Sequence, residues 1–229
     1  MGTHLSRLAL AIGLFLALSL SPRLSAPAEA AGITCDGKTP TIVSDSNVVN
    51  GTPGDDIIAS SRVPVDSHDG VNIFGGGGND IICGTWVPDF LHGGDGNDVV
   101  IGLGGNDRLE GEAGSDTLNG GDGDDVLWGN GQADLLKGGA GHDTLFGGTS
   151  NDRLYGEEGS DVLWGEGGAD ILYGMQDNDD IYGGTGDDKI WDRSGLNKFD
   201  AGDGTDACEG NSWYLWPLNS CEWHLVVQP

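Results

Sequence analysis

An aspartate recurs at one fixed place in a nine-residue repeat that runs from Gly75 to Glu209 without insertion or deletion. Fifteen units fit the frame, among them GGDGNDVVI from Gly93 and GGAGHDTLF from Gly138, and position six is acidic in every unit except the fourteenth. Carboxylates held in register suit Ca²⁺, which accepts about six to eight hard oxygen ligands in irregular geometry, better than Mg²⁺, which requires a tight octahedron. The spacing therefore predicts a series of calcium sites.

The rest of the repeat must hold these carboxylates in place. Glycine opens thirteen of the fifteen units and recurs at positions two and four, where it lets the backbone turn its carbonyl oxygens toward one point. Position eight is apolar throughout, as in Leu109 and Leu118, and alternation along a strand points this residue into the interior. A constant short period with one apolar place indicates a solenoid with a thin aliphatic core.

The units resemble the RTX, or haemolysin-type, calcium-binding repeat G-G-x-G-x-D-x-U-x, which the units at Gly93 and Gly138 match at every fixed position. The resemblance implies an all-β fold, a parallel β-roll (β-solenoid) of about eight coils with short N- and C-terminal caps. It also implies two units per coil, with the first six residues of each unit in a calcium-holding turn and the last three in a short strand.

With two units per coil, residues eighteen apart stack, and position six divides into two columns on opposite edges of the roll. Successive strands lie ~4.8 Å apart, so calcium between coils would remove the repulsion between neighbouring carboxylates. An isolated unit, GTPGDDIIA, adds Asp56 under Asp80 once the insertion at 60–65 is removed. The predicted metal ligands are Asp56, Asp80, Asp89, Asp98, Asp107, Asp116, Asp125, Asp134, Asp143, Asp152, Asp161, Asp170, Asp179, Asp188 and Asp206.

Several units depart from the pattern. Position four, usually glycine, is occupied by Val87, Gln132, Ser150 and Asp177, which puts the local turn geometry in doubt. The fourteenth unit, DRSGLNKFD, opens with aspartate and has Asn197 at position six. We expect calcium occupancy to fail first around the last three of these position-four residues and around the fourteenth unit.

Position nine, which should face solvent, becomes aromatic in the second half of the array, and eighteen-residue spacing stacks these side chains into two ladders. Such ladders are either a contact surface for a carbohydrate or protein or a cross-strand stack that stabilises the sheet face. The residues are Trp128, Phe146, Trp164 and Tyr182 in one ladder and Tyr155, Tyr173 and Trp191 in the other.

Residues 1–30 have the pattern of a secretory signal peptide. Arg7 precedes an apolar run from Leu8 to Leu20, and the small-residue sequence ending at Ala30 indicates cleavage there. The 13 residues of this run fall short of the ~20 that a membrane-spanning helix needs. We expect a secreted, extracellular protein without a membrane span.

The remaining chain divides into three parts. Residues 31–50 are predicted to form an N-terminal cap of one or two short strands, 51–209 the roll with a surface loop at 60–65, and 210–229 a C-terminal cap. Repeat arrays need atypical ends that cover the core and the open strand edge. Residues suited to capping at the C-terminal end are Trp213, Tyr214, Trp216, Trp223 and Leu225.

Four cysteines remain after processing, an even number that favours two disulfides in a secreted chain. Because a solenoid holds its two ends far apart, the expected pairs are Cys35 with Cys83 and Cys208 with Cys221. No CxxC or Cys–His spacing indicates zinc.

The formal charge of −27 argues against nucleic acid and anionic membranes as partners and favours cations. No serine or cysteine forms a nucleophile motif with a histidine of the mature chain, so we do not expect an enzyme. These histidines are His68, His92, His142 and His224. The short flanks of the array leave no room for a catalytic domain in this sequence.

Together these features predict a secreted calcium-ion-binding repeat protein whose β-roll folds as many Ca²⁺ ions bind between coils. One alternative is an extracellular adhesion or carbohydrate-binding module that uses the aromatic ladders. The other is an extracellular polysaccharide-acting enzyme or its accessory.

Overall fold

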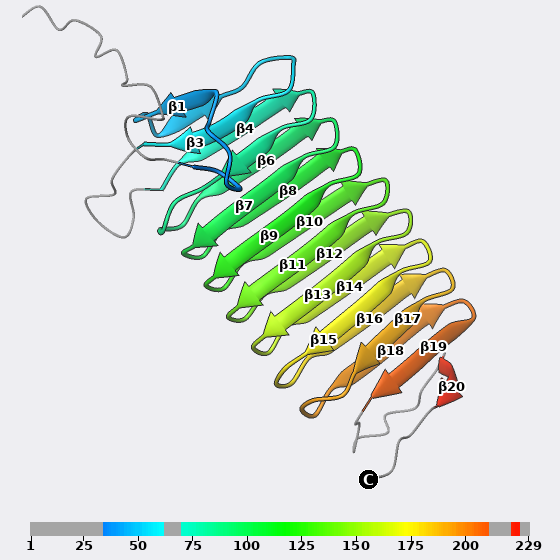
Figure 1. Ribbon diagram of the computed structural model, residues 1–229. Helices are drawn as coiled ribbons and strands as arrows, with labels where there is room; N and C mark the ends of the chain where they lie inside the picture. Colours follow the sequence, from blue (N-terminus) through cyan, green and yellow to red (C-terminus); the bar gives the residue numbers. More distant parts are fainter. Residues whose placement is uncertain (1–33, 62–69, 211–220, 225–229) are drawn as a thin grey trace, which may run out of the picture.

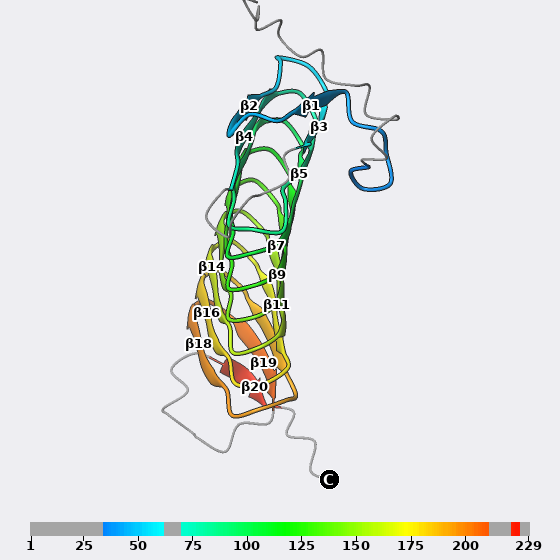
Figure 2. The ribbon, with the colours of Figure 1, turned by 90° about the vertical axis from the view of Figure 1, so that its left-hand side faces the viewer.

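The computed structural model describes residues 34–61, 70–210 and 221–224, which form strands and turns and include no helix. The strands build two parallel sheets that face each other, with turns along both long edges (Figures 1 and 2). Within this described part, no helix has the length and apolar character that crossing a membrane requires. The predicted signal peptide lies outside the described residues.

One sheet has eleven strands and the other nine, and the chain alternates between them from β1 to β19. The eleven-stranded sheet contains, in spatial order, β1 (Ile42–Ser44), β3 (Ile57–Ser60), β5 (Ile81–Cys83), β7 (Val99–Gly104), β9 (Thr117–Asp122), β11 (Leu135–Ala140), β13 (Arg153–Glu158), β15 (Ile171–Met175), β17 (Lys189–Asp192), β19 (Asp206–Gly210) and β20 (Cys221–His224). The nine-stranded sheet contains β2 (Val48–Asn50), β4 (Asn72–Gly77), β6 (Phe90–Asp95), β8 (Arg108–Ala113), β10 (Val126–Gly131), β12 (Thr144–Thr149), β14 (Val162–Gly167), β16 (Asp180–Thr185) and β18 (Lys198–Asp203).

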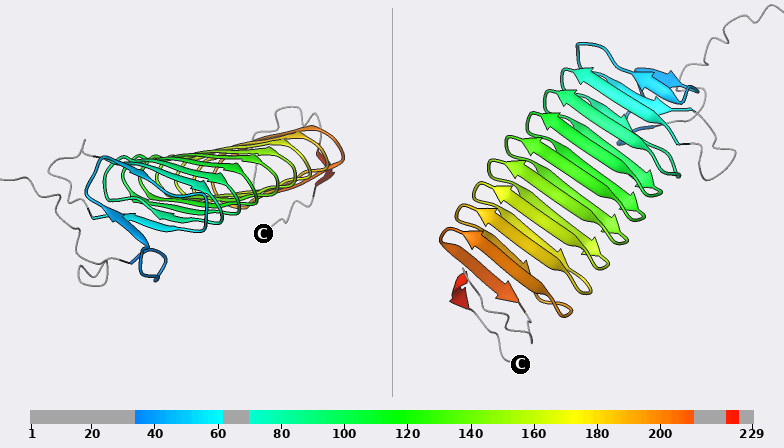
Figure 3. Two further views of the ribbon diagram at one scale, coloured as in Figure 1. Left: turned by 90° about the horizontal axis from the view of Figure 1, so that it is seen from above. Right: turned by 180° about the vertical axis from the view of Figure 1, so that it is seen from behind.

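The predicted parallel β-roll is confirmed, with about nine turns where eight were expected. The additional turn comes from the N-terminal segment, because β1 pairs with β3 and β2 with β4, both in parallel. The turns stack along one axis from the N-terminal to the C-terminal end of the described chain (Figure 3). The eighteen-residue stacking is also confirmed, since Val100 lies beside Leu118 in register.

Most strands are six residues long, twice the expected length. Each runs from position seven of one unit to position three of the next. The pairing nevertheless has a gap at position one: β7 pairs with β9 at Ile101 and again at Leu103, but not at Gly102. The glycine interrupts the ladder without ending it, which explains why two short segments continue as one strand.

The position-eight side chains of the two facing sheets form one continuous core, as predicted. Every such side chain from Ile82 to Ile190 has no exposed surface, and Phe199 packs against this core beside Ile181. Burial of one leucine side chain stabilises a fold by about 1.5–3 kcal/mol. The core is long and narrow, so each turn depends mainly on the two turns beside it.

Both disulfides have the predicted pairing, each with a Cα–Cα distance of 5.7 Å. Cys35 joins Cys83 on the outer side of the eleven-stranded sheet, where both pack with Ala59 in a second apolar cluster. The N-terminal segment therefore covers part of the sheet face beside the first turns. At the other end, Cys208 holds β20 against β19 through Cys221.

Several predicted features lie outside the described residues. These are most of the loop at 60–65 and the capping residues Trp213, Tyr214, Trp216 and Leu225, together with the side chain of Trp223.

Candidate metal centres

The position-six aspartates occupy both long edges of the roll, where each turn enters its strand. All are buried, with exposed fractions of 8% for Asp56 and 3% or less for the others. Burial of so many carboxylates is unusual, because an ionised side chain in the interior requires a compensating partner. Each of the two oxygens of each carboxylate has a different environment.

The first oxygen, Oδ1, joins one turn to the next. The backbone N–H of Asp80 donates to Asp98 Oδ1 at 2.7 Å, and the N–H of Asp98 donates in turn to Asp116 Oδ1 at 2.8 Å. Across the insertion, the N–H of Asp56 donates to Asp80 Oδ1 at 2.7 Å, so Asp56 lies under Asp80 as the sequence predicts. The aspartate side chain is long enough to reach the backbone N–H of the adjacent turn directly.

The second oxygen, Oδ2, has no hydrogen-bond partner in most units. An unpartnered buried carboxylate oxygen is costly, so each needs a cation or a proton. The buried aspartates with an unpartnered Oδ2 are Asp80, Asp98, Asp107, Asp116, Asp125, Asp134, Asp143, Asp152, Asp161, Asp170, Asp179, Asp188, Asp192 and Asp206.

Backbone carbonyl oxygens approach the same places, and the position-one glycine makes room for them. A Cβ added to Gly93 would lie 2.4 Å from Asp98 Oδ2 and 2.8 Å from the carbonyl oxygen of Gly111. Carboxylate and carbonyl oxygens from successive turns thus converge at most position-one glycines. This donor set, hard oxygen from both side chain and backbone, fits Ca²⁺.

Burial raises the pKa of the carboxyl groups in the middle of the two columns well above the usual range for aspartate, although the hydrogen bond to Oδ1 lowers it. The pKa of Asp98 rises to about 6 and that of Asp107 to about 8, in both cases mainly by desolvation and further by neighbouring carboxylates. Near neutral pH, protons therefore compete with metal for the columns when the roll is folded.

Asp56 and Asp89 differ from the other predicted ligands. The N–H and hydroxyl of Thr85 donate to Asp89 Oδ2 at 2.6 and 3.0 Å, and those of Thr52 donate to Asp56 Oδ2 at 2.7 and 2.9 Å. Protein donors satisfy Oδ2 in both units. Threonine at position two of GTPGDDIIA and GTWVPDFLH was the sequence signal for this difference.

The fourteenth unit compensates for its missing position-six acid. Asn197 keeps the inter-turn contact, since its Oδ1 accepts a hydrogen bond from the N–H of Asp179 at 2.9 Å. Asp192, at position one, is buried, and a Cβ added to Gly174 would lie 2.2 Å from its Oδ2 and 2.4 Å from Asp179 Oδ2. Burial raises the pKa of both carboxyl groups. Sequence reasoning counted the lost acid but missed this replacement.

The doubtful position-four residues retain the turn in three of four units. Gln132, Ser150 and Asp177 adopt positive φ values of 70°, 86° and 68°, in the region that glycine occupies in neighbouring units. Such a conformation costs a non-glycine residue on the order of 1 kcal/mol. Val87, which precedes Pro88, does not share it. The expected weaker occupancy of these units stays a prediction.

A second inter-turn ladder, not foreseen from the sequence, runs through position five. The N–H of Asn97 donates to Asn79 Oδ1 at 2.8 Å, and the N–H of Ser115 donates to Asn97 Oδ1 at 2.8 Å. These side chains reach toward the C-terminal end of the roll, whereas the position-six side chains reach toward the N-terminal end. The many Asn and Asp residues at position five were the available signal.

Comparison with known families agrees with this geometry. The profile of the RTX calcium-binding nonapeptide repeat matches residues 72–91, 84–118, 110–145, 137–172, 146–181 and 173–208, which together cover more than half of the chain. The protein belongs to the RTX calcium-binding repeat family. No curated protein sequence matches it.

In this RTX roll the predicted aromatic ladders lie on the outer faces of the two sheets, and their rings stack. Trp164 and Tyr182 have ring centroids 3.8 Å apart and an interplanar angle of 7°. Most of the ladder side chains are half-buried, and Trp164 is exposed. Stacking covers ring faces that a sugar would otherwise contact. The stacked pairs are Trp128 with Phe146, Trp164 with Tyr182, Tyr155 with Tyr173, and Tyr173 with Trp191.

Proposed function

We propose that this RTX protein is a secreted calcium-binding protein whose roll folds as Ca²⁺ ions bind between successive turns. The observation that supports this most directly is the set of buried Oδ2 atoms without hydrogen-bond partners. Most of them lie beside a position-one glycine and a carbonyl oxygen of the next turn, as Asp98 Oδ2 does at Gly93. Calcium would supply positive charge at these places and link two turns through shared ligands.

The aspartates with an unpartnered Oδ2 are the proposed ligands, and they include Asp192, which is not at position six. Asp56 and Asp89 are proposed to stabilise their turns without calcium, because Thr52 and Thr85 already donate to their Oδ2 atoms. The proposed role of calcium is structural: it neutralises buried carboxylates and joins adjacent turns. We propose no enzymatic activity.

Folding is coupled to binding through linkage. The chain carries a formal charge of −27, and the ligands of each site come together only when two turns stack. Any ion that binds the folded state alone shifts the equilibrium toward that state. High calcium outside the cell would therefore favour the folded roll, and the two disulfides are typical of an oxidising extracellular environment.

Secretion would use the signal peptide at residues 1–30, with cleavage after Ala30. Mass determination of the protein recovered from the culture medium tests this step. A mature N-terminus at Ala31 is expected, and a chain that stays in the cell with Met1 intact would contradict it.

Circular dichroism and calorimetry test the main proposal. Purified mature protein, freed of metal at pH 8, is expected to gain β-sheet signal on addition of millimolar Ca²⁺ and to lose it on addition of a chelator. Mg²⁺ at the same concentration is the control and should have little effect. An unchanged spectrum in the chelator together with no heat of calcium binding would reject the proposal.

A second candidate function is a carbohydrate or protein contact at the C-terminal end of the eleven-stranded sheet. A hollow of about 430 Å³ lies there, lined by Tyr173, Met175, Gln176, Trp191, Asp192 and Arg193. Glycan-array binding by the calcium-loaded protein, lost in Trp191→Ala and retained in Trp128→Ala, would support it. Absence of glycan binding by the wild-type protein would count against a carbohydrate ligand.

A further inference from the structure

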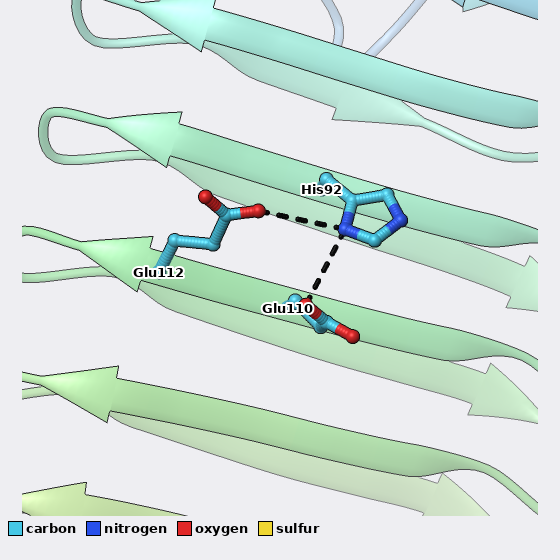
Figure 4. A group of neighbouring side chains, drawn as sticks. All are labelled: His92, Glu110 and Glu112. Carbon is cyan, nitrogen blue, oxygen red and sulfur yellow. Dashed lines mark ion pairs between the residues drawn. The ribbon is translucent and has the colours of Figure 1, made fainter.

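Three side chains of types that bind metal ions lie together on the outer face of the nine-stranded sheet, and none of them belongs to the two aspartate columns. His92 lies on β6, and Glu110 and Glu112 lie on the adjacent strand β8 (Figure 4). His92 is in register with Glu110, and Glu112 is in register with Gly94, whose lack of a side chain leaves space beside the imidazole. The eighteen-residue stacking creates this group, since His92 and Glu110 are both at position nine of their units and Glu112 lies two residues farther along β8.

The distances suit a small metal ion. His92 Nδ1 is 3.4 Å from Glu110 Oε2 and 3.5 Å from Glu112 Oε1, and one ligand atom from each residue lies within 4.8 Å of the others. Ligands bound tetrahedrally at ~2.0–2.2 Å are about 3.4 Å apart. Two of the three separations therefore need no large change, and the partly exposed glutamates are free to adjust the third.

The imidazole is held in place by its neighbour on the other side. The Phe74 ring on β4 stacks on His92 with a centroid distance of 4.7 Å and an interplanar angle of 7°. The His92 side chain is 23% exposed, whereas those of Glu110 and Glu112 are 40% and 48% exposed. A fixed nitrogen and two mobile carboxylates allow a metal to bind without loss of much side-chain freedom at the histidine.

We propose that His92, Glu110 and Glu112 form a surface site for a divalent transition metal, with Zn²⁺ the best match. One imidazole and two carboxylates suit zinc, copper and nickel, whereas calcium prefers oxygen ligands alone. A flat sheet supplies ligands from one side only, which leaves a coordination position for water or for a ligand from another molecule. The site differs in its donor chemistry from the RTX calcium sites, and none of its three ligands belongs to the aspartate columns.

An ion pair of His92 with the two glutamates is the simpler alternative, and such exposed pairs contribute only about 0–1 kcal/mol to stability. Zinc calorimetry on untagged mature protein in saturating Ca²⁺ separates the two interpretations. Calcium occupies the aspartate columns under these conditions, and circular dichroism of the same sample reports whether the roll is folded. The expected result is one Zn²⁺ bound per chain. Co²⁺ bound at the same site should give visible absorption bands.

His92→Gln is expected to abolish this binding and Glu112→Gln to weaken it by about tenfold or more, with the calcium-loaded spectrum unchanged in both. His142→Gln is the matched control, because its ring lies at a turn where Nδ1 contacts the backbone of Ser160. Retained binding in that control supports the proposal. Equal zinc isotherms for wild-type and His92→Gln protein, or no zinc binding by folded wild-type protein, would overturn it.

Discussion

Thr85 donates two hydrogen bonds to one oxygen of Asp89, its N–H at 2.6 Å and its hydroxyl at 3.0 Å from Oδ2. Thr52 makes the same pair of contacts with Asp56. Neither threonine has the positive φ found at position two of neighbouring units, such as 111° at Gly94. The residue at position two therefore distinguishes two kinds of unit. Where it is threonine, protein donors hydrogen-bond to Oδ2 of the position-six aspartate; in most other units that oxygen has no partner and needs a cation.

Replacement of Thr85 by glycine should convert its unit to the second kind. Thr85→Gly removes the hydroxyl and restores backbone freedom, which leaves Asp89 Oδ2 with fewer donors. The metal-free protein is expected to lose about 1–3 kcal/mol of stability, and calcium-loaded protein to bind one more Ca²⁺, measured by calorimetry with elemental analysis. Thr85→Ser keeps both donors and should match wild type. An unchanged calcium count in Thr85→Gly would contradict this interpretation.

The same contacts predict that the two ends of the roll depend on calcium to different degrees. The two units in which threonine donates to Oδ2, those of Asp56 and Asp89, lie in the N-terminal turns, near the Cys35–Cys83 disulfide. In a chelator, amide hydrogen exchange is expected to remain slow in β3 and β6, the strands that follow Asp56 and Asp89, and to become fast in β9 to β14, where Oδ2 atoms are unpartnered. Uniformly fast or uniformly slow exchange would show that the threonines give no local independence.

The sequence predicted the features that depend on a repeated residue type. The aliphatic position eight determines the core, the eighteen-residue spacing brings Asp98 over Asp80, and separation of the ends selects the disulfides. Features that depend on single atoms were missed. A repeat pattern does not distinguish Oδ1 of Asp98, which accepts a backbone hydrogen bond, from Oδ2, which lacks one. Nor does it show that Asp192 replaces the acid absent at Asn197, because the two residues belong to different repeat positions.

The outer-face group of His92, Glu110 and Glu112 was missed for a related reason. Its members occupy variable positions of three units, so no motif in the linear sequence connects them. The eighteen-residue spacing stacks His92 on Glu110, but only the structure shows that Glu112, in register with Gly94, also reaches the imidazole. The strand length was also underestimated, because the glycine at position one interrupts the ladder and the pairing then resumes.

The pH dependence of the metal-free roll follows from the raised pKa values. Burial lifts the pKa of Asp98 to about 6, of Asp125 to about 7 and of Asp107 to about 8, so the folded state binds more protons than the unfolded state between pH ~4 and ~8. The stability contributed by these protons is complete below the unfolded pKa of about 3.9 and is lost as pH rises through about 6 to 8.

Metal-free protein is therefore expected to melt at a higher temperature at pH 5.5 than at pH 8, where the carboxylates ionise without a counter-ion. Calcium should reverse this order and should release protons when it binds at pH 6 to 7, measurable by calorimetry in buffers of different ionisation enthalpy. Thermal melts of resin-treated protein, without added chelator, provide the comparison. A higher melting temperature at pH 8 without metal would contradict the raised pKa values.

Asp192 provides the sharpest test of how the irregular fourteenth unit binds metal. Its carboxylate lies with that of Asp179 near Gly174, where a regular unit would present a glycine carbonyl oxygen. Asp192→Asn removes one of two adjacent buried charges, so it should reduce the calcium count by one in the loaded protein and stabilise the metal-free protein. Asp200→Asn, at an exposed position nine of the same unit, is the matched control and should change neither. If Asp192→Asn binds as many Ca²⁺ ions as wild type with equal affinity, the carboxylate pair is not a calcium site. The fourteenth unit then interrupts its column of sites, as the asparagine at Asn197 indicates.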